Sequence, residues 1–292
     1  MADALVDDVD LHGPARSGAL RRFIRHKLAL YGVLVIAFLL VASACASWLA
    51  PFDPDEIDIV NRYAPPLSPS HWLGADDLGR DVLSRLMHAG QVSLSVGIVA
   101  MLVTVIVGFA VGASAAYHGG WVEIVLMRFT DIMLCFPSVF LLLFVAAFVP
   151  PSLSSMALMI GLTCWMELAR IIYAQIRSLK QMDFIAAARM VGAPAWRIIL
   201  RQILPNSMAP IFVAATLNTA NAILLESYIS FLGYGIQPPQ ASWGNMLTNA
   251  QSAFQVDPWL AIFPGVAITL AVACFNFMGD GLRDALDPKV RD

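Results

Sequence analysis

The chain has 292 residues, of which 59% are hydrophobic and 13% are charged, and its formal net charge is −3. Soluble domains contain roughly 45 to 50% apolar and about 25% charged residues. The composition therefore excludes an ordinary soluble domain and indicates a protein of the lipid bilayer. The four cysteines all fall in apolar runs, where a thiol behaves as a small hydrophobic group, so they predict no disulfide framework.

Apolar runs in the chain reach or approach the length of about 20 residues that a membrane-spanning helix needs. We predict an all-α, polytopic membrane protein with six spans, at residues 28–50, 91–117, 132–149, 153–173, 203–232 and 259–278. Polar tails flank these spans at residues 1–27 and 280–292. An even number of spans places both tails on one side of the membrane.

Basic residues are concentrated in three segments, residues 16–27, 170–201 and 283–291. Cytoplasmic segments beside membrane spans carry an excess of Lys and Arg. Both tails and the loop after the fourth span are therefore expected to be cytoplasmic, in agreement with the even number of spans. The first span has a basic flank, as a secretory signal peptide has, but its apolar stretch is too long for one.

Residues 51–88 are predicted to form an extracytoplasmic segment that begins rich in proline and acidic residues. Asp76 or Asp77 is then expected to cap an amphipathic helix along the membrane interface. Ser70, in this segment, and Ser242, after the fifth span, should face outward, whereas Ser178 should face the cytoplasm.

Two sequence features predict how the spans are shaped and packed. Gly108 and Gly112 form a GxxxG spacing in the second span, which allows a neighbouring helix to approach closely. Pro137 in the third span and Pro210 in the fifth lack an amide hydrogen, so each predicts a kink or locally freed backbone carbonyls.

Acidic residues inside the spans are candidates for a transport role, because an ionised carboxylate in the bilayer faces protein or a water-filled path. Asp131 has Arg128 three residues before it, and Glu167 has Arg170 three residues after it, so both predict structural ion pairs. Glu226 has no basic residue within a helical turn. We expect its partner to be a group on another helix, a protein carbonyl or water, with an interhelical structural contact favoured over a pathway or gating role.

The loop after the fourth span is long and patterned, with the sequence DFIAAARMVGAPAWRIILRQILPN at residues 183–206. Asp183 is suited to cap a helix over residues 184–191, which Gly192 would end in the left-handed conformation, and Pro194 suits the first turn of a second helix. Successive alanines at 186–188 leave one side of the first helix without bulk, so another protein's backbone could approach it. An amphipathic helix at the membrane interface is the alternative interpretation.

Within this loop, the alanines at 186–188, Gly192, Leu204 and Pro205 have a spacing that resembles the cytoplasmic coupling loop of ATP-binding-cassette importer permeases. The chain departs from that pattern in having alanine at 186 where glutamate is usual and Gln202 where isoleucine is usual. Three further segments resemble the dipeptide, oligopeptide and nickel branch of that family, and together they indicate its C-type permease subunit: residues 71–85, 235–247 and 279–289.

The resemblance implies a type I importer permease fold, with a permease domain at residues 89–279 and a coupling loop at about residues 177–205. It implies contact with the ATPase subunits for Asp183, Phe184, Ala186, Ala187, Ala188, Gly192, Leu204 and Pro205. Implied partners are a second homologous permease subunit, two cytoplasmic ATP-binding subunits and an extracytoplasmic solute-binding protein. The implied location is the inner membrane of a bacterium, and nucleic acid is not an expected partner.

The residues themselves predict no enzyme activity. No lysine lies in a Walker A motif, and the histidines and cysteines lack metal-site spacing, so ATP and Mg are expected only in the partner subunits. Selectivity is implied to reside mostly in the binding protein, which leaves peptides, nickel chelates, glutathione and antibiotics open as cargo. A secondary transporter or channel driven by ion gradients is the alternative function, with the intramembrane acids carrying protons.

Overall fold

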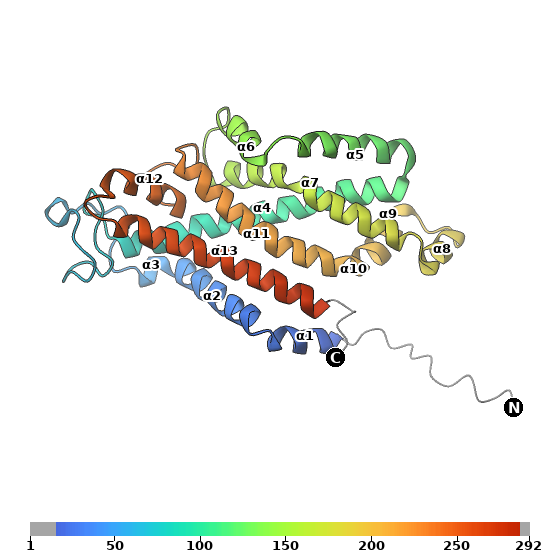
Figure 1. The fold of residues 1–292 in the computed structure, drawn as a ribbon, viewed down its shortest axis with the longest axis horizontal. Helices are drawn as coiled ribbons and strands as arrows, with labels where there is room; N and C mark the ends of the chain where they lie inside the picture. The colour runs from blue at the N-terminus through green and yellow to red at the C-terminus, as the bar shows by residue number, and fades with distance from the viewer. Residues whose placement is uncertain (1–15, 287–292) are drawn as a thin grey trace.

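A computed structural model describes residues 16–286 of the chain, and Figure 1 shows a bundle of long helices. No strand is present within the described residues. The helices long and apolar enough to cross a membrane are α2 (Lys27–Ala44), α4 (Val82–His118), α7 (Leu153–Leu179), α11 (Met208–Phe231) and α13 (Trp259–Leu286). A sixth span is present if the bent pair α5 (Gly120–Leu134) and α6 (Ser138–Ala146) is taken as one.

Short elements connect and flank the long helices. They are α1 (Arg16–Arg25), α3 (Ala46–Leu49), the 3-10 turn Ile59–Asn61, α8 (Asp183–Met190), α9 (Ala195–Ile198), the π-helical turn Ile199–Ile203, α10 (Leu204–Asn206) and α12 (Trp243–Ala253). The polar tails expected at 1–27 and 280–292 are helical where they are described, since α1 lies in the first and α13 runs on to Leu286. Residues 1–15 and 287–292 of these tails lie outside the described part.

The third span is not the single helix expected at residues 132–149. The chain bends by 86° between α5 and α6. Pro137 lies at this break with ψ 125°, an extended conformation from which α6 starts. The kink predicted from Pro137 is confirmed, and it is a full break because the ring removes a hydrogen-bond donor and restricts the residue before it.

The second expected proline effect lies beside an interruption of the helix: α10 ends at Asn206, Ser207 intervenes and α11 begins at Met208, two residues before Pro210. Pro210 falls in the first turn of α11, where an amide hydrogen would have no partner within the helix. A different proline, Pro264, is buried inside α13.

The interfacial helix expected to start at Asp76 or Asp77 does not form as a separate element. Asp76 instead holds a tight turn: its Oδ1 accepts the amides of Leu78 and Arg80, both at 2.9 Å. Asp81 caps α4 by accepting the Ser84 amide at 2.8 Å, and α4 then continues unbroken to His118. Short acidic side chains that bond nearby amides compete with helix formation, which explains the late start of the helix.

The α4 and α7 helices share an extensive interface, and small residues bring their backbones together. A Cβ atom on Gly112 would lie 2.4 Å from the carbonyl oxygen of Ala169, and one on Gly161 would lie 2.8 Å from that of Ala100. The GxxxG prediction for Gly108 and Gly112 is therefore confirmed as a site of close helix packing.

The two ends of the bundle carry different segments (Figure 1). One end holds α1, α8 and the end of α13, whereas the other holds α3, α12 and residues 51–81. This grouping agrees with the common side expected for the loop at residues 183–206 and both tails, while the orientation across the membrane stays a prediction. Ser242 is fully buried as the N-cap of α12, so it is a poor site at which to test that prediction by labelling.

Candidate functional site

The loop at residues 183–206 folds as a compact helical elbow, which we call the elbow hereafter. Its first helix, α8, spans Asp183–Met190, so Asp183 lies in the first turn rather than before it. Gly192 then adopts φ +77°, the left-handed conformation predicted for it. Pro194 has ψ 149° and stands at the N-cap of α9, one position earlier than expected. The predicted helix-turn-helix arrangement is confirmed with these small shifts.

Buried isoleucines attach the elbow to the bundle. Ile185 of α8, Ile198 of α9 and Ile203 of the π-helical turn are each 0% exposed. They belong to one apolar cluster that also contains Ala116 of α4 and Ile176 of α7. The elbow is therefore packed against the ends of two long helices, and a force applied to it would reach them directly.

The outer surface of the elbow carries several exposed apolar side chains. Met190 is 83% exposed, Val191 89% and Trp196 58%. Ala186 and Ala187 are exposed beside them. Large exposed apolar side chains of this kind are typical of a surface that contacts another protein or the membrane.

Not every residue assigned to partner contact faces outward. Ala188 is half-buried and packs on the apolar cluster that holds the elbow, and so does Leu204. Asp183, Phe184 and Pro205 are exposed. Ala188 and Leu204 thus contribute to attaching the elbow, because α8 turns its Ile185 side toward the bundle.

The sequence did not indicate the π-helical turn at Ile199–Ile203. Within it, the buried side-chain oxygen of Gln202 has no hydrogen-bond partner among the described residues. The Gln202 carbonyl accepts the side-chain amide of Asn206 at 2.6 Å. A widened turn frees backbone groups of this kind, and such turns are frequent at functional sites.

Glu226 is fully buried between three helices. Ser93 of α4 donates to its Oε2 at 2.8 Å, and Ser230 donates to its Oε1 at 2.8 Å. The Ser93 hydroxyl in turn accepts the amide of Trp243, the first residue of α12, at 3.2 Å. The expected partner on another helix is present, and the carboxylate links α4, α11 and α12. A gating role for Glu226 stays a prediction.

The ion pairs predicted within the other helices are wrong. Arg170 of α7 pairs with Asp131 of α5. Glu167 therefore lacks the partner expected for it, and Asp131 is paired with Arg170 and not with Arg128. The packing of α5 on α7 decides this pairing, which local spacing could not reveal. Among residues 16–286, Glu167 has no ion pair or hydrogen bond, and no cluster of His, Cys, Asp and Glu could hold a metal ion.

Family models match most of the chain. Residues 105–292 match the model described as a binding-protein-dependent transport system inner membrane component. Residues 16–66 match the one described as the N-terminal TM domain of oligopeptide transport permease C.

Curated relatives extend over nearly the whole length. A putative peptide permease protein of Brucella ovis is 40% identical over 94% of this chain and 93% of its own length. The oligopeptide transport system permease protein OppC of Haemophilus influenzae is 38% identical over 98% of this chain and 93% of its own. The glutathione transport system permease protein GsiD of Pectobacterium atrosepticum is 37% identical over 93% and 90%.

An all-helical bundle with five or six candidate spans is the architecture of a polytopic membrane protein. The chain belongs to the family of binding-protein-dependent transport system inner membrane components, and within it to the dipeptide, oligopeptide and nickel branch of the ATP-binding-cassette importer permeases. Members of this family are components of a transport channel and not enzymes.

Proposed function

We propose that this chain forms half of the translocation channel of an ATP-driven importer for di- and oligopeptides or related small solutes, and that the elbow couples it to cytoplasmic ATPase subunits. The coupling is proposed because the two faces of the elbow differ. Its outer face exposes large apolar side chains, while Ile185, Ile198 and Ile203 bury its inner face against α4 and α7. A subunit that moves this face moves the membrane helices with it.

The proposed complex contains a second homologous permease subunit, two ATP-binding subunits that carry ATP and Mg, and an extracytoplasmic solute-binding protein. Relatives named for oligopeptide, dipeptide and glutathione transport support a peptide-like cargo. The elbow and both tails lie in the cytoplasm of the proposed complex, where the ATP is. Closure of the ATPase subunits around ATP pulls on the elbow, and the spans change their packing between inward-open and outward-open states.

Gly192 provides a test of the coupling. A Cβ atom on Gly192 would meet nothing within 4 Å, so substitution there acts through backbone conformation and not through a clash. Left-handed conformation costs a residue with a Cβ atom about 1–2 kcal/mol, and a β-branched residue pays most. Gly192→Val should therefore insert normally but reduce binding of the ATPase subunits and uptake, whereas Gly192→Asn, which tolerates this conformation, should retain both.

Ala187 provides an independent test on the outer face. Ala187→Trp adds bulk at the proposed contact, and Ala187→Ser is the matched control that adds almost none. The measurements are co-purification of the ATPase subunits and ATP-driven uptake in reconstituted vesicles. Full uptake by both Gly192→Val and Ala187→Trp would show that the elbow does not transmit the ATPase motion.

The alternative, a transporter driven by ion gradients, makes a different prediction for the same vesicles. Uptake should then persist without ATP and stop when an ionophore collapses the gradient. Uptake by the proposed importer should require ATP and continue in the presence of the ionophore.

A further inference from the structure

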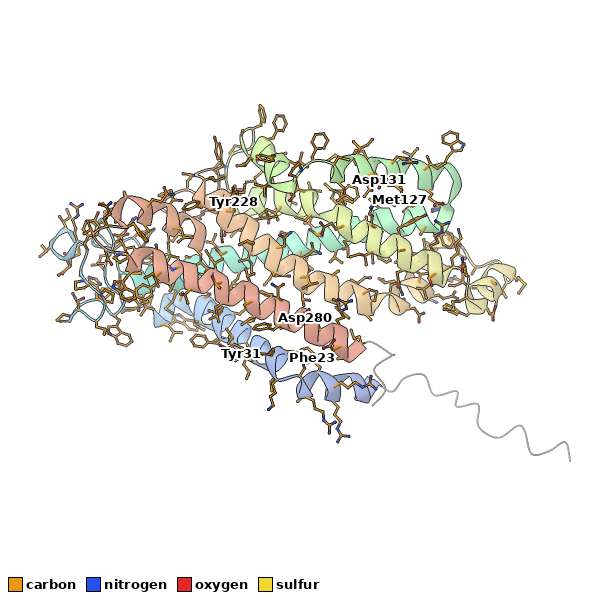
Figure 2. The ribbon with its side chains drawn as sticks, in the orientation of Figure 1. Phe23, Tyr31, Met127, Asp131, Tyr228 and Asp280 are labelled. Atoms are coloured by element: carbon orange, nitrogen blue, oxygen red, sulfur yellow. The ribbon has the colours of Figure 1, made fainter. Side chains whose placement is uncertain are left out.

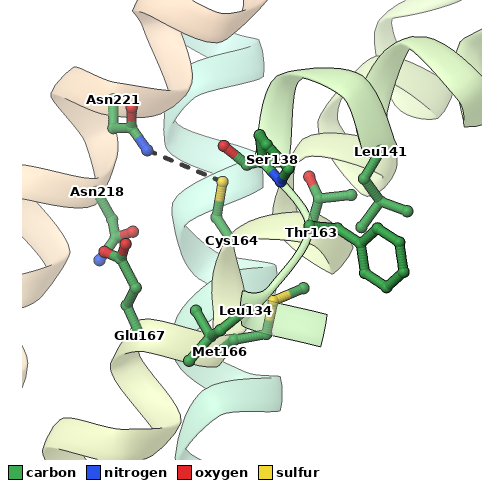
Figure 3. A pocket seen from close by; sticks show the side chains of 11 residues that line it. Leu134, Ser138, Leu141, Thr163, Cys164, Met166, Glu167, Asn218 and Asn221 are labelled. Carbon is green, nitrogen blue, oxygen red and sulfur yellow. Dashed lines mark hydrogen bonds between the residues drawn. The ribbon is translucent and has the colours of Figure 1, made fainter. Parts of the chain in front are cut away.

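A cavity of about 230 Å³ opens on the side of the bundle at the break between α5 and α6 (Figure 3). Its other walls are α7 and α11. The polar side chains that line it are Ser138, Thr163, Cys164, Glu167, Asn218 and Asn221. The cavity lies where the chain turns at Pro137 between α5 and α6, beside the middle of α7.

Glu167 lies near the middle of α7, a helix of membrane-spanning length, and its side chain is exposed. No basic side chain lines the cavity around it. Arg170, its expected partner, is paired with Asp131 instead. A carboxylate at this depth requires protein, water or a ligand beside it, and within the described residues no protein group forms an ion pair or a hydrogen bond with Glu167. Glu226 is the opposite case, since serine hydroxyls surround it.

Two amides from α11 enter the same cavity. The side-chain nitrogen of Asn218 donates to the Ala214 carbonyl at 2.8 Å, which leaves its oxygen free as an acceptor. The side-chain nitrogen of Asn221 lies 4.0 Å from the Cys164 sulfur, a weak contact, and Asn221 is exposed. Figure 3 shows Glu167 pointing from α7 to the side of the cavity where Asn218 lies, with Asn221 farther along α11 beside Cys164. The cavity thus offers one anionic acceptor beside two groups able to hydrogen-bond an amide.

We propose that Glu167, Asn218 and Asn221 form a contact site on the translocation path, at which Glu167 binds a cationic group of a passing peptide and the amides bond its main chain. This inference rests on the proposed importer function. The cationic group is the peptide's α-ammonium group or a Lys or Arg side chain. A pocket for a whole drug-sized ligand measures about 300–1,000 Å³, so this smaller cavity holds one residue of the peptide at a time.

The competing explanation is that a basic side chain of the second permease subunit neutralises Glu167 in the complex. The two explanations predict different access of solvent to Glu167. A contact site is open to water and attracts cations, whereas an intersubunit ion pair is closed and attracts none.

The first experiment measures access in the assembled importer. Asn221→Cys is introduced after the native cysteines have been replaced, and its labelling rate is compared for a cationic and an anionic methanethiosulfonate of similar size. A nearby carboxylate should favour the cationic reagent by about three- to tenfold. Glu167→Gln should abolish that preference. Asp280→Asn, which removes an exposed carboxylate on α13 away from α5, should leave it unchanged (Figure 2). Absence of labelling by either reagent, or equal rates with Glu167 present, would overturn the proposal.

The second experiment measures ATP-driven uptake at saturating binding protein for a peptide with a free amino terminus and for its acetylated form. Glu167→Gln should lower uptake of the cationic form relative to the acetylated one by about threefold or more, with normal assembly of the complex. An equal loss for both peptides together with poor assembly would identify Glu167 as a structural contact. If the unmodified complex moves neither peptide with ATP, the proposed importer function fails; if it moves both and the ratio is unaffected by Glu167→Gln, only this inference fails.

Discussion

Glu226 should act mainly through the hydrogen bonds that join α4, α11 and α12. Glu226→Leu introduces an apolar side chain of similar length. It leaves the hydroxyls of Ser93 and Ser230, which each donate to Glu226 at 2.8 Å, without their acceptor. An unsatisfied buried polar group costs about 1–3 kcal/mol. The two hydroxyls together therefore predict a loss of roughly 2–6 kcal/mol in the stability of the folded subunit.

Glu226→Gln should cost much less. The glutamine oxygen accepts from one serine, and its amide nitrogen donates to the other, because a hydroxyl oxygen has two lone pairs and each serine oxygen already accepts only one backbone amide. We expect assembly close to that of the unmodified chain, and a loss of about 1 kcal/mol for exchanging a charged acceptor for a neutral one.

The assay is the fraction of complex that survives heating in detergent, measured by size-exclusion chromatography, together with uptake per assembled complex. Ser93→Ala serves as the second arm of a double-mutant cycle. Because both changes remove the same bond, the effects of Ser93→Ala and Glu226→Leu should be strongly non-additive. Additive losses, or Glu226→Leu as stable as Glu226→Gln, would refute this reasoning. Normal assembly of Glu226→Gln with lost uptake would instead establish the gating role.

Two further predictions concern packing and orientation. Gly112→Val should lower the thermal midpoint by an amount that corresponds to about 1–3 kcal/mol or more, because its Cβ atom would lie 2.4 Å from the Ala169 carbonyl oxygen. Gly265→Ala on α13 is the matched control, with open space around the new methyl group, and should be neutral or stabilising; equal losses for both would contradict the packing argument. In a chain without native cysteines, an impermeant thiol reagent on intact cells should label cysteine at the exposed Gln240 but not at the exposed Ser178, and the reverse pattern would invert the topology.

Local features of the sequence determined the helical class, most of the spans and the elbow. A run of apolar residues predicts a span because lipid offers backbone groups no hydrogen bonds, so the chain must satisfy its own. The turn at Gly192 was predictable because only glycine tolerates its conformation freely, and the break at Pro137 because proline lacks an amide hydrogen. Gly112 likewise indicated close packing, although not which helix would approach.

Partnerships between distant segments were decided only by the tertiary structure. Spacing along one helix assigned Arg170 to Glu167, but packing of α5 on α7 brings Asp131 to Arg170 from 39 residues away. The same holds for Glu226, whose partner Ser93 is 133 residues distant. A charged side chain takes whichever partner the folded chain places nearest, and that depends on helix packing rather than on sequence separation. Glu167 is left facing a cavity for this reason.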